Sequence, residues 1–492
     1  MICVVVGRTR HKRMIAEHQY LVQKGIQLVE LRLDYIGRTV DLKRLISDRP
    51  GPVIVTCRRK QDGGNWEGSE EDRVTLLRSA IAAGVDYVDL ESDIASTIPR
   101  FGKTQRIVSM HDFEKTPNNL AELHAEMAAM DADIVKLATM ATTPSDNLRM
   151  LQLIDSSDVP TVGICMGDLG SPSRILATKY GAPFTFASFG ETKSLAPGQF
   201  SYRQMMQIYR EHKIDADTEV FGVIADPVGH SLSPDIHNAA FEYMNMNRVY
   251  LPLRIPAEHL SQFITDCPAM GILGLSVTIP HKQAVLQLCT GPDEEVVGIG
   301  AANTLVFDDS SIAAHNTDCS AALDSLEEAL GITETGRDVL NGKSALLLGG
   351  GGVAKAIAFG LRHRGADVFV ATRSPQKAAP LAESLGCQII DWNDRHSQSA
   401  NIIVNCTPIG MHPNVDETPF DKQHLDSSMV VFDAVYNPEN TVLIKEAADI
   451  GCTVITGVDM FVRQAAIQFR HFTGQEAPMN VMREVMRQRF DS

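Results

Sequence analysis

A lysine lies in the middle of a run whose other residues are typical of a buried strand, Asp133-Ile-Val-Lys136-Leu-Ala-Thr139. Lysine is almost never fully buried unless it has a specific role. Removal from water disfavours its ammonium form, and the neutral amine can attack a ketone. A lysine on an edge strand that reaches solvent fits this segment alone equally well.

A histidine upstream favours the first interpretation. The strand-like run Arg106–Ser109 is followed at its carboxyl end by His111. A lysine that forms an iminium and a histidine that moves protons are the groups needed to eliminate water β to a ketone. The two residues together therefore predict a dehydration.

Arginines and acids follow several other strand-like runs. The period of two places Glu30, Arg32 and Asp34 on one side of a strand. Arg58 precedes a loop that contains Asp62 and two glycines, and Arg174 and Gln199 lie in later loops. Three arginines indicate a substrate with a carboxylate, which guanidinium binds in a bidentate manner. Surface ion pairs are the alternative for the run Glu30–Asp34.

Eight strand-like runs alternate with helix-like segments from residue 1 to about residue 212. They are Ile2–Val6, Leu28–Leu33, Val53–Cys57, Tyr87–Leu90, Arg106–Ser109, Ile134–Ala138, Val162–Met166 and Phe184–Ala187. This pattern predicts a (β/α)8 TIM barrel, whose active site lies at the carboxyl ends of the strands.

Composition restricts the possible partners. The net charge of −16 argues against nucleic acids and anionic membranes. Nine scattered cysteines without a CxxC pair indicate a reducing compartment. We find neither a targeting segment nor a membrane span, and we expect a cytoplasmic protein that acts on small molecules. We expect no metal, because each ketone is activated by an iminium or by a proton donor.

A glycine turn marks a second fold after residue 219. An apolar run from Ser344 leads into Gly349-Gly-Gly-Gly-Val-Ala354 and then a helix, which predicts a Rossmann dinucleotide site. The next strand ends in Thr372 and Arg373, where an NAD site would carry an acid. NADP(H) is therefore the expected cofactor. The residues assigned to it are Gly349, Gly350, Gly351, Gly352, Val353, Thr372, Arg373, Lys377 and Gly457.

Residues 1–205 resemble type I 3-dehydroquinate dehydratases through the motifs ELRLD, SMHDF, DIVKLA, SPSR and APGQ. The resemblance implies Lys136 as the Schiff-base residue and His111 as the proton-transfer residue. It also implies that Glu30 orients His111 or the substrate. Arg32, Arg58, Arg174 and Gln199 would contact the substrate. Two residues depart from the family pattern. Family members carry Glu at the position of Asp62, and some carry Ser at the position of Leu195. Both positions are expected on the side of the mobile lid.

Residues 219–492 resemble shikimate dehydrogenases through GHSLSP, SVTIPHK, ANT, NTD, NCTPIGM, YNP and GVDMFVRQ. The resemblance implies Lys282 and Asp318 as the catalytic pair, for which a surface ion pair is the alternative. It implies shikimate contacts from Ser231, Ser233, Thr278, Asn303, Tyr436 and Gln464. Small hydroxyl and amide side chains suit a polyhydroxylated ring, and Lys282 can protonate an alkoxide.

The sequence therefore predicts a two-enzyme α/β chain of the shikimate pathway, which leads to aromatic amino acids. The expected domains are a barrel at 1–212, a linker at 213–218, a shikimate-binding domain at 219–320 completed by 458–492, and an NADP-binding Rossmann domain at 321–457. Two alternatives stay open: a quinate/shikimate dehydrogenase that uses NAD in the second half, and a ligand-sensing regulator on the same folds. The presence of Lys136, His111, Lys282 and Asp318 favours catalysis over sensing.

Arg373→Ala should raise the Michaelis constant for NADPH far more than that for NADH. The substitution removes a charged contact to the 2′-phosphate, worth on the order of 1.5–3 kcal/mol. Steady-state kinetics with each nucleotide checks this, and an equal loss with both would show that Arg373 has a structural role instead.

Overall fold

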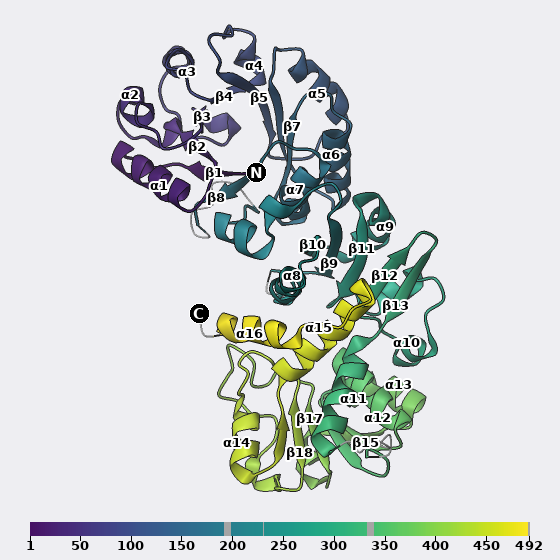
Figure 1. The fold of residues 1–492 in the computed structure, drawn as a ribbon. Coiled ribbons are helices and arrows are strands. Elements are labelled where there is room, and N and C mark those ends of the chain that lie inside the picture. Colours follow the sequence, from purple (N-terminus) through teal and green to yellow (C-terminus); the bar gives the residue numbers. More distant parts are fainter. Residues whose placement is uncertain (191–197, 230, 332–338, 491–492) are drawn as a thin grey trace. The chain divides into compact units, whose positions relative to one another are not determined.

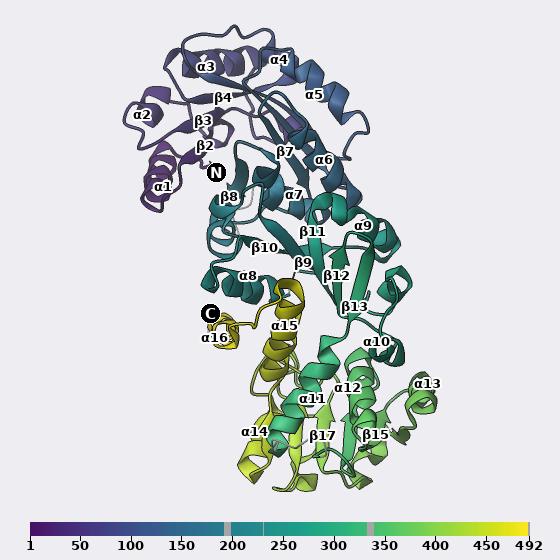
Figure 2. The same cartoon turned by 45° about the vertical axis from the view of Figure 1, so that its right-hand side comes forward.

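The computed structural model describes residues 1–190, 198–229, 231–331 and 339–490, without the side chains of 377, 380 and 381. The chain divides into two compact units (Figures 1 and 2). The first unit comprises Met1–Gly222, Asp226–Gly229 and Asn247–Ile272. The second comprises Val223–Ala225, His230–Met246 and Leu273–Ser492.

The first unit is built on an eight-stranded parallel sheet of the TIM-barrel type, in the order β7-β6-β5-β4-β3-β2-β1-β8. Its strands are β1 (Ile2–Val6), β2 (Leu28–Arg32), β3 (Val53–Thr56), β4 (Tyr87–Glu91), β5 (Gln105–Asp112), β6 (Ile134–Met140), β7 (Thr161–Met166) and β8 (Thr185–Ser188). The helices between them are α1 (His11–Gln23), α2 (Leu42–Ile46), α3 (Glu70–Ala82), α4 (Ser92–Ala95), α5 (Leu120–Ala128), α6 (Ser145–Asp155) and α7 (Ser171–Leu176). All eight predicted strands are present.

Alternation along the strands sets the layers inside the barrel. Apolar side chains such as Leu28, Ile107 and Ile134 form one buried cluster. Two residues further along the same strands come Glu30, Ser109 and Lys136, each of which is buried. Because successive odd or even positions of a strand face the same side, the polar layer lies above the apolar one. Lys136 on β6 is therefore an interior residue, and the edge-strand alternative is wrong.

The prediction that Asp34 continues its strand is also wrong. Strand β2 ends at Arg32, and Leu33–Tyr35 forms a 3-10 turn. The turn allows both carboxylate oxygens of Asp34 to accept from the Arg32 guanidinium, at 2.9 and 2.8 Å. Asp34 also accepts from the backbone N–H of Asn65, which ties this turn to the loop after β3. Local ion pairing therefore overrides the period of two.

A second sheet follows the barrel, in the order β10-β9-β11-β12-β13. Its strands are β9 (Glu219–Ala225), β10 (Arg248–Arg254), β11 (Ile272–Val277), β12 (Thr304–Asp308) and β13 (Ser311–His315). The helices in this part of the sequence are α8 (Ser233–Tyr243), α9 (Leu260–Asp266) and α10 (Glu294–Ile299). Strand β12 pairs antiparallel with both β11 and β13, so the chain reverses twice before Asn316.

The third sheet is parallel, in the order β16-β15-β14-β17-β18-β19. It contains β14 (Ser344–Leu348), β15 (Asp367–Thr372), β16 (Gln388–Asp391), β17 (Ile402–Asn405), β18 (Val430–Asp433) and β19 (Thr453–Ile455). The helices of this part are α11 (Thr317–Leu330), α12 (Gly352–His363), α13 (Pro375–Leu385), α14 (Val442–Ile450), α15 (Gly457–Thr473) and α16 (Met479–Phe490). This strand order is that of the Rossmann fold, as the glycine turn predicts.

The two faces of this sheet are covered by different helices. Ala345 and Leu347 of β14 belong to the cluster that includes residues of α11 and α12. Leu346 and Leu348 belong to the cluster that includes Leu443 of α14. Figure 1 shows α11 and α12 on one side of β17 and β18 and α14 on the other. Strand β14 is therefore buried on both faces, which explains its uninterrupted apolar sequence.

The compact units divide the chain differently from the predicted domains, because Asn247–Ile272 groups with the barrel. The predicted boundaries at 212, 219, 320 and 457 stay predictions. Among the described helices, none is long and apolar enough to cross a membrane.

Gly360→Ala should lower the free energy of unfolding of the second unit by about 1–3 kcal/mol. A Cβ on Gly360 would lie 2.6 Å from Cδ1 of Leu323 and 2.9 Å from Sγ of Cys319, both on α11. Gly352→Ala is the control on the same helix, because its Cβ would meet no atom within 4 Å. Urea unfolding without nucleotide measures both, and equal stability of the two variants would contradict close packing of α11 on α12.

Candidate active sites

A cavity of ≈ 580 Å³, counted to its open mouth, lies among the barrel strands and the loops that follow them. Its lining combines polar and charged residues with apolar ones: Glu30, Arg32, Arg58, Asp62, His111, Lys136, Arg174 and Gln199, with Val5, Gly63, Phe113, Ala138, Ile164, Met166 and Phe186. All eight residues that the sequence assigns to dehydration therefore line one cavity.

Lys136 does not lie in an apolar environment alone. Its Nζ is 3.0 Å from Oδ2 of Asp89 and 3.9 Å from Oε1 of Glu30, and it lies 4.3 Å from the centre of the Phe186 ring. Burial opposes ionisation of Asp89, yet the charges of Arg58 and Lys136 hold its pKa well below the usual range. The burial of Lys136 does not by itself predict this carboxylate, which compensates the lysine charge inside the barrel.

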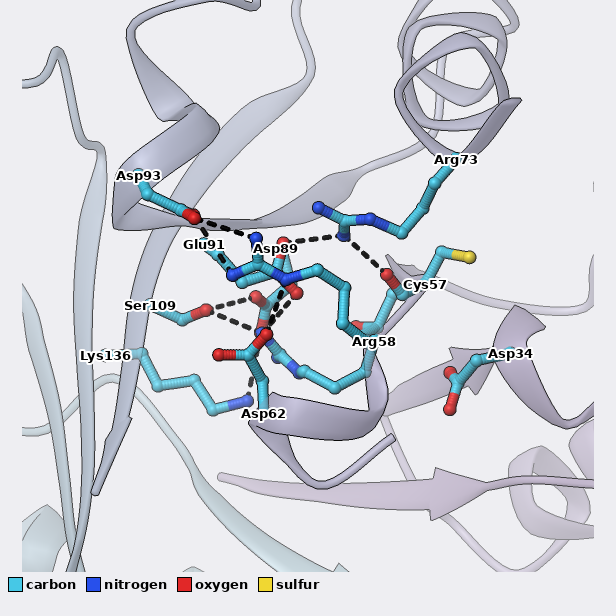
Figure 3. Close-up of polar contacts among 12 residues, drawn as sticks. Asp34, Cys57, Arg58, Asp62, Arg73, Asp89, Glu91, Asp93, Ser109 and Lys136 are labelled. Carbon is cyan, nitrogen blue, oxygen red and sulfur yellow. Dashed lines mark hydrogen bonds and ion pairs between the residues drawn. The ribbon is translucent and has the colours of Figure 1, made fainter. Parts of the chain in front are cut away.

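Asp89 belongs to a buried network of alternating charge (Figure 3). Arg58 pairs with Asp89 at 2.7 Å and with Glu91 at 3.0 Å, and it donates to Oγ of Ser109 at 2.9 Å. On its other side, Glu91 accepts from Arg73 of α3 at 2.7 Å. Arg58 is thus fixed by two carboxylates at the wall of the cavity.

The sequence analysis missed Asp89, Glu91 and Arg73. A signal for the two acids was present, because they interrupt the apolar run Tyr87–Glu91 at a spacing of two. That spacing places both on the face of β4 that looks into the barrel. No sequence signal marks Arg73, because an arginine three residues after Glu70 on a helix is typical of a solvated ion pair.

His111 lies half-buried at the end of β5, which extends to Asp112. Burial, together with the positive charges of Arg58 and Lys136, holds the pKa of His111 well below its usual range. Its Nδ1 is buried and has no hydrogen-bond partner within the described residues. The ring stacks on Phe113 at 6.1 Å. A neutral imidazole with an open nitrogen can accept a proton from a molecule in the cavity.

The remaining predicted residues differ in how strongly they are held. Glu30 accepts from Oγ1 of Thr56 at 2.7 Å. Asp62 accepts from Nε of Arg59 at 2.6 Å, which ties this acid to its own loop. Burial lowers the pKa of Arg174 to about 10, so its guanidinium stays charged at neutral pH. Leu195 lies outside the described residues.

The predicted pair of the second half is formed. Nζ of Lys282 donates to Oδ2 of Asp318 at 2.5 Å, and Lys282 is half-buried whereas Asp318 is buried. Asp318 lies in the first turn of α11, directly after Thr317. Oδ1 of Asn303 accepts from the backbone N–H of Thr317 at 2.8 Å. Oγ1 of Thr317 lies 3.5 Å from Oε1 of Gln464. Asn303 and Gln464 are therefore both next to the helix start that carries Asp318.

The other four predicted shikimate contacts lie on three separate segments. The backbone N–H of Ser233 donates to Oγ of Ser231 at 3.3 Å, at the start of α8. The backbone N–H of Thr278 donates to the carbonyl of Ile224 at 3.1 Å, which joins the loop after β11 to β9. Tyr436 packs on Phe461 of α15 with ring centres 5.0 Å apart, and burial raises the pKa of its phenol.

The glycine turn fits a dinucleotide. Gly349 has φ +101°, and a Cβ there would lie 2.9 Å from Cγ2 of Thr407, so this position requires glycine. At Gly351 and Gly352 a Cβ would meet no atom within 4 Å. No side chain caps the start of α12. Its first backbone N–H groups therefore have no capping side chain, which suits diphosphate binding.

The other assigned cofactor residues surround this turn or follow it. Oγ1 of Thr372 accepts from the backbone N–H of Ser374 at 3.1 Å, and Arg373 is exposed directly after β15. A Cβ on Gly350 would lie 3.4 Å from Cβ of Ala378. Val353 packs against the core, and Gly457 begins α15. The side chain of Lys377 lies outside the described part of the chain. An exposed arginine without a neighbouring acid at 372–374 suits a 2′-phosphate.

Asp89→Asn should lower the free energy of unfolding by about 3–5 kcal/mol, because it leaves the charges of Arg58 and Lys136 inside the barrel without their shared carboxylate. Asp131→Asn is the control, since Asp131 pairs with Arg100 at an exposed site and should cost about 0–1 kcal/mol. Chemical denaturation measures both. Equal losses would show that the buried pair has no special weight.

Comparisons with known proteins match different family models to successive parts of the chain. A family model described as type I 3-dehydroquinase matches residues 2–216. The shikimate dehydrogenase substrate-binding domain matches residues 223–305, and the shikimate 5′-dehydrogenase C-terminal domain matches residues 457–487. A model of an NADP oxidoreductase, coenzyme F420-dependent, matches residues 344–434.

Individual relatives cover either the whole chain or its second half. The chain is 37% identical to a chloroplastic bifunctional 3-dehydroquinate dehydratase/shikimate dehydrogenase of Arabidopsis thaliana, over 99% of this chain and 84% of that protein. It is 42% identical to the shikimate dehydrogenase (NADP(+)) of Methanopyrus kandleri, over 56% of this chain and 96% of that protein.

A crystal structure of a shikimate dehydrogenase in complex with NADP+ has 35% sequence identity and a TM-score of 0.53, and covers 56% of this chain and 97% of its own. The structure of shikimate dehydrogenase from Aquifex aeolicus has 31% identity and a TM-score of 0.51, over 56% of this chain and 99% of its own. Because the Arabidopsis protein matches nearly the whole of this chain, the chain belongs to the family of bifunctional 3-dehydroquinate dehydratase/shikimate dehydrogenases.

Proposed function

We propose that this chain catalyses two consecutive reactions of the shikimate pathway at the sites described above. The first unit dehydrates 3-dehydroquinate to 3-dehydroshikimate through a Schiff base on Lys136. The second reduces 3-dehydroshikimate to shikimate with NADPH. The observation that carries the first assignment is a buried lysine and a neutral histidine that line the same cavity. The Lys282–Asp318 pair carries the second.

In the dehydration, the Lys136 ammonium loses a proton and the free amine attacks the substrate ketone. The iminium forms as the ketone oxygen leaves as water, with that proton and one further proton of the amine. The iminium withdraws electrons from the adjacent carbon. His111 accepts a proton from that carbon and then donates it to the departing hydroxyl. Asp89 and Glu30 hold Nζ in place from two sides. Arg174, charged at neutral pH, provides a guanidinium for the substrate carboxylate.

In the reduction, bound NADPH would supply a hydride to the ketone carbon. Lys282 donates a proton to the carbonyl oxygen as charge develops there, and Asp318 orients its ammonium at 2.5 Å. Asn303 and Gln464, both buried, offer amides to the ring hydroxyls. The start of α12 would hold the diphosphate, and Arg373 would hold the 2′-phosphate.

The compartment and the range of partners are also proposals. All nine cysteines are free thiols, which supports a reducing compartment such as the cytoplasm. The Arabidopsis relative is chloroplastic by name. The net charge of −16 supports small-molecule substrates rather than nucleic acid.

Borohydride added together with 3-dehydroquinate should trap a covalent adduct on Lys136 and abolish dehydration, because it reduces the iminium. Peptide mass spectrometry locates the adduct. Lys136→Ala should lose both the adduct and the dehydratase activity while NADPH-dependent reduction of 3-dehydroshikimate continues in the same chain. An adduct elsewhere, or dehydration that survives the substitution, would remove the iminium mechanism.

A further inference from the structure

Asp433 is a buried carboxylate that the proposed chemistry does not use. It ends strand β18, has no exposed surface, and forms no ion pair within the described residues. Burial raises its pKa to about 6. An acid without a cationic partner in a protein core is costly, so its presence indicates a role that an apolar residue could not fill.

Three donors from three different segments meet at this carboxylate. Oδ1 accepts from Nδ2 of Asn405 at 2.9 Å and from the backbone N–H of Val435 at 3.0 Å. Oδ2 accepts from Oγ1 of Thr441 at 2.7 Å. Asn405 ends β17, Val435 lies in the loop after β18, and Thr441 caps helix α14.

The Asn405 branch leads to the glycine turn. Oδ1 of Asn405 accepts from both the backbone N–H and Oγ1 of Thr407, at 2.9 and 2.7 Å. Thr407 in turn accepts from the backbone N–H of Ile409 at 3.2 Å. Cγ2 of Thr407 lies 2.9 Å from the position that a Cβ on Gly349 would occupy. The loop folded by Asn405 therefore packs directly on the turn that holds the dinucleotide.

The Val435 branch leads to the substrate side. The carbonyl oxygen of Val435 lies 2.2 Å from the position of a Cβ on Gly457, so this loop contacts the start of α15 without a gap. Helix α15 carries Gln464. Tyr436, which follows Val435 in the chain, packs on Phe461 of the same helix. The hydrogen bond from the backbone N–H of Val435 to Asp433 thus fixes the loop that carries Tyr436.

We infer that Asp433 is a positioning residue that links the dinucleotide turn to the shikimate-facing loop, so that one carboxylate fixes both ligands of the reduction relative to each other. This inference rests on the proposed function of the second site. Hydride transfer requires the two reacting carbons to be aligned closely. The hydrogen bonds of Asp433, which connect the loop against Gly349 to the loop that carries Tyr436, maintain that alignment.

Asp433→Asn in the full-length chain tests the inference, because it replaces one acceptor oxygen by a donor. We expect the Michaelis constants for both NADPH and 3-dehydroshikimate to rise about five- to tenfold. The dehydratase activity of the same chain should not change and serves as an internal control. Asp426→Asn, the same change in an exposed turn where Asp426 accepts from Ser428, should leave all constants as they are.

A lower melting temperature with both Michaelis constants within twofold of the parent would mean that Asp433 is only structural, and would overturn the inference. A rise in only one of the two constants would overturn the link between the sites.

If the second unit of Asp433→Asn fails to fold, Thr407→Val tests the same hydrogen-bond network. This variant keeps the methyl group against Gly349 and removes the hydroxyl that donates to Asn405. It should raise the Michaelis constant for NADPH alone, and an unchanged constant overturns the inference. Should the parent chain bind NADPH without reducing 3-dehydroshikimate, the proposed function fails. The NADPH affinity of Asp433→Asn, measured by fluorescence, then decides the inference separately.

Discussion

The ion pair between Lys136 and Asp89 is the interaction around which the interior of the barrel is arranged. A buried ammonium without compensation would cost several kcal/mol, and so would a buried carboxylate. Here Asp89 meets both Lys136 and Arg58, Arg58 also meets Glu91, and Glu91 meets Arg73. Each charge has a neighbour of opposite sign. A reactive lysine can therefore lie deep in the barrel without unfolding it.

This arrangement requires the parallel strands to keep their register. Ser109 of β5 lies opposite Lys136 of β6, and Asp89 of β4 lies opposite Ile107 of β5. A shift of one residue in any of these strands would turn its polar side chain out of the barrel. The apolar layer below, which includes Ile134 and Phe184, holds the register because it fills the interior.

In the second half of the chain, the buried polar groups of the site are held mainly by contacts with neutral groups. Asn303, Thr317 and Gln464 form a chain of amide and hydroxyl contacts, and Asp433 is held by an amide, a hydroxyl and a backbone N–H. Lys282 and Asp318 form an ion pair at this site, with Lys282 half-buried and Asp318 buried. The contacts among Asn303, Thr317 and Gln464 join neutral groups, which cost less to bury than charges do.

Local pattern was enough to predict the eight barrel strands and the glycine turn, whereas the roles of most site residues follow from the family resemblance and stay predictions. Strand runs such as Ile134–Ala138 and the motif from Gly349 to Ala354 carry their signal within a few residues, through period, β-branching and glycine. Asp89 and Asp433 were not predicted as site residues, and Asp34 was placed in a strand that ends before it. The reason is physical: the role of each depends on partners far along the chain, at residues 58 and 136 for Asp89, and at 405 and 441 for Asp433. Sequence determines which side chains can do chemistry, whereas only the folded register decides which charge lies beside which.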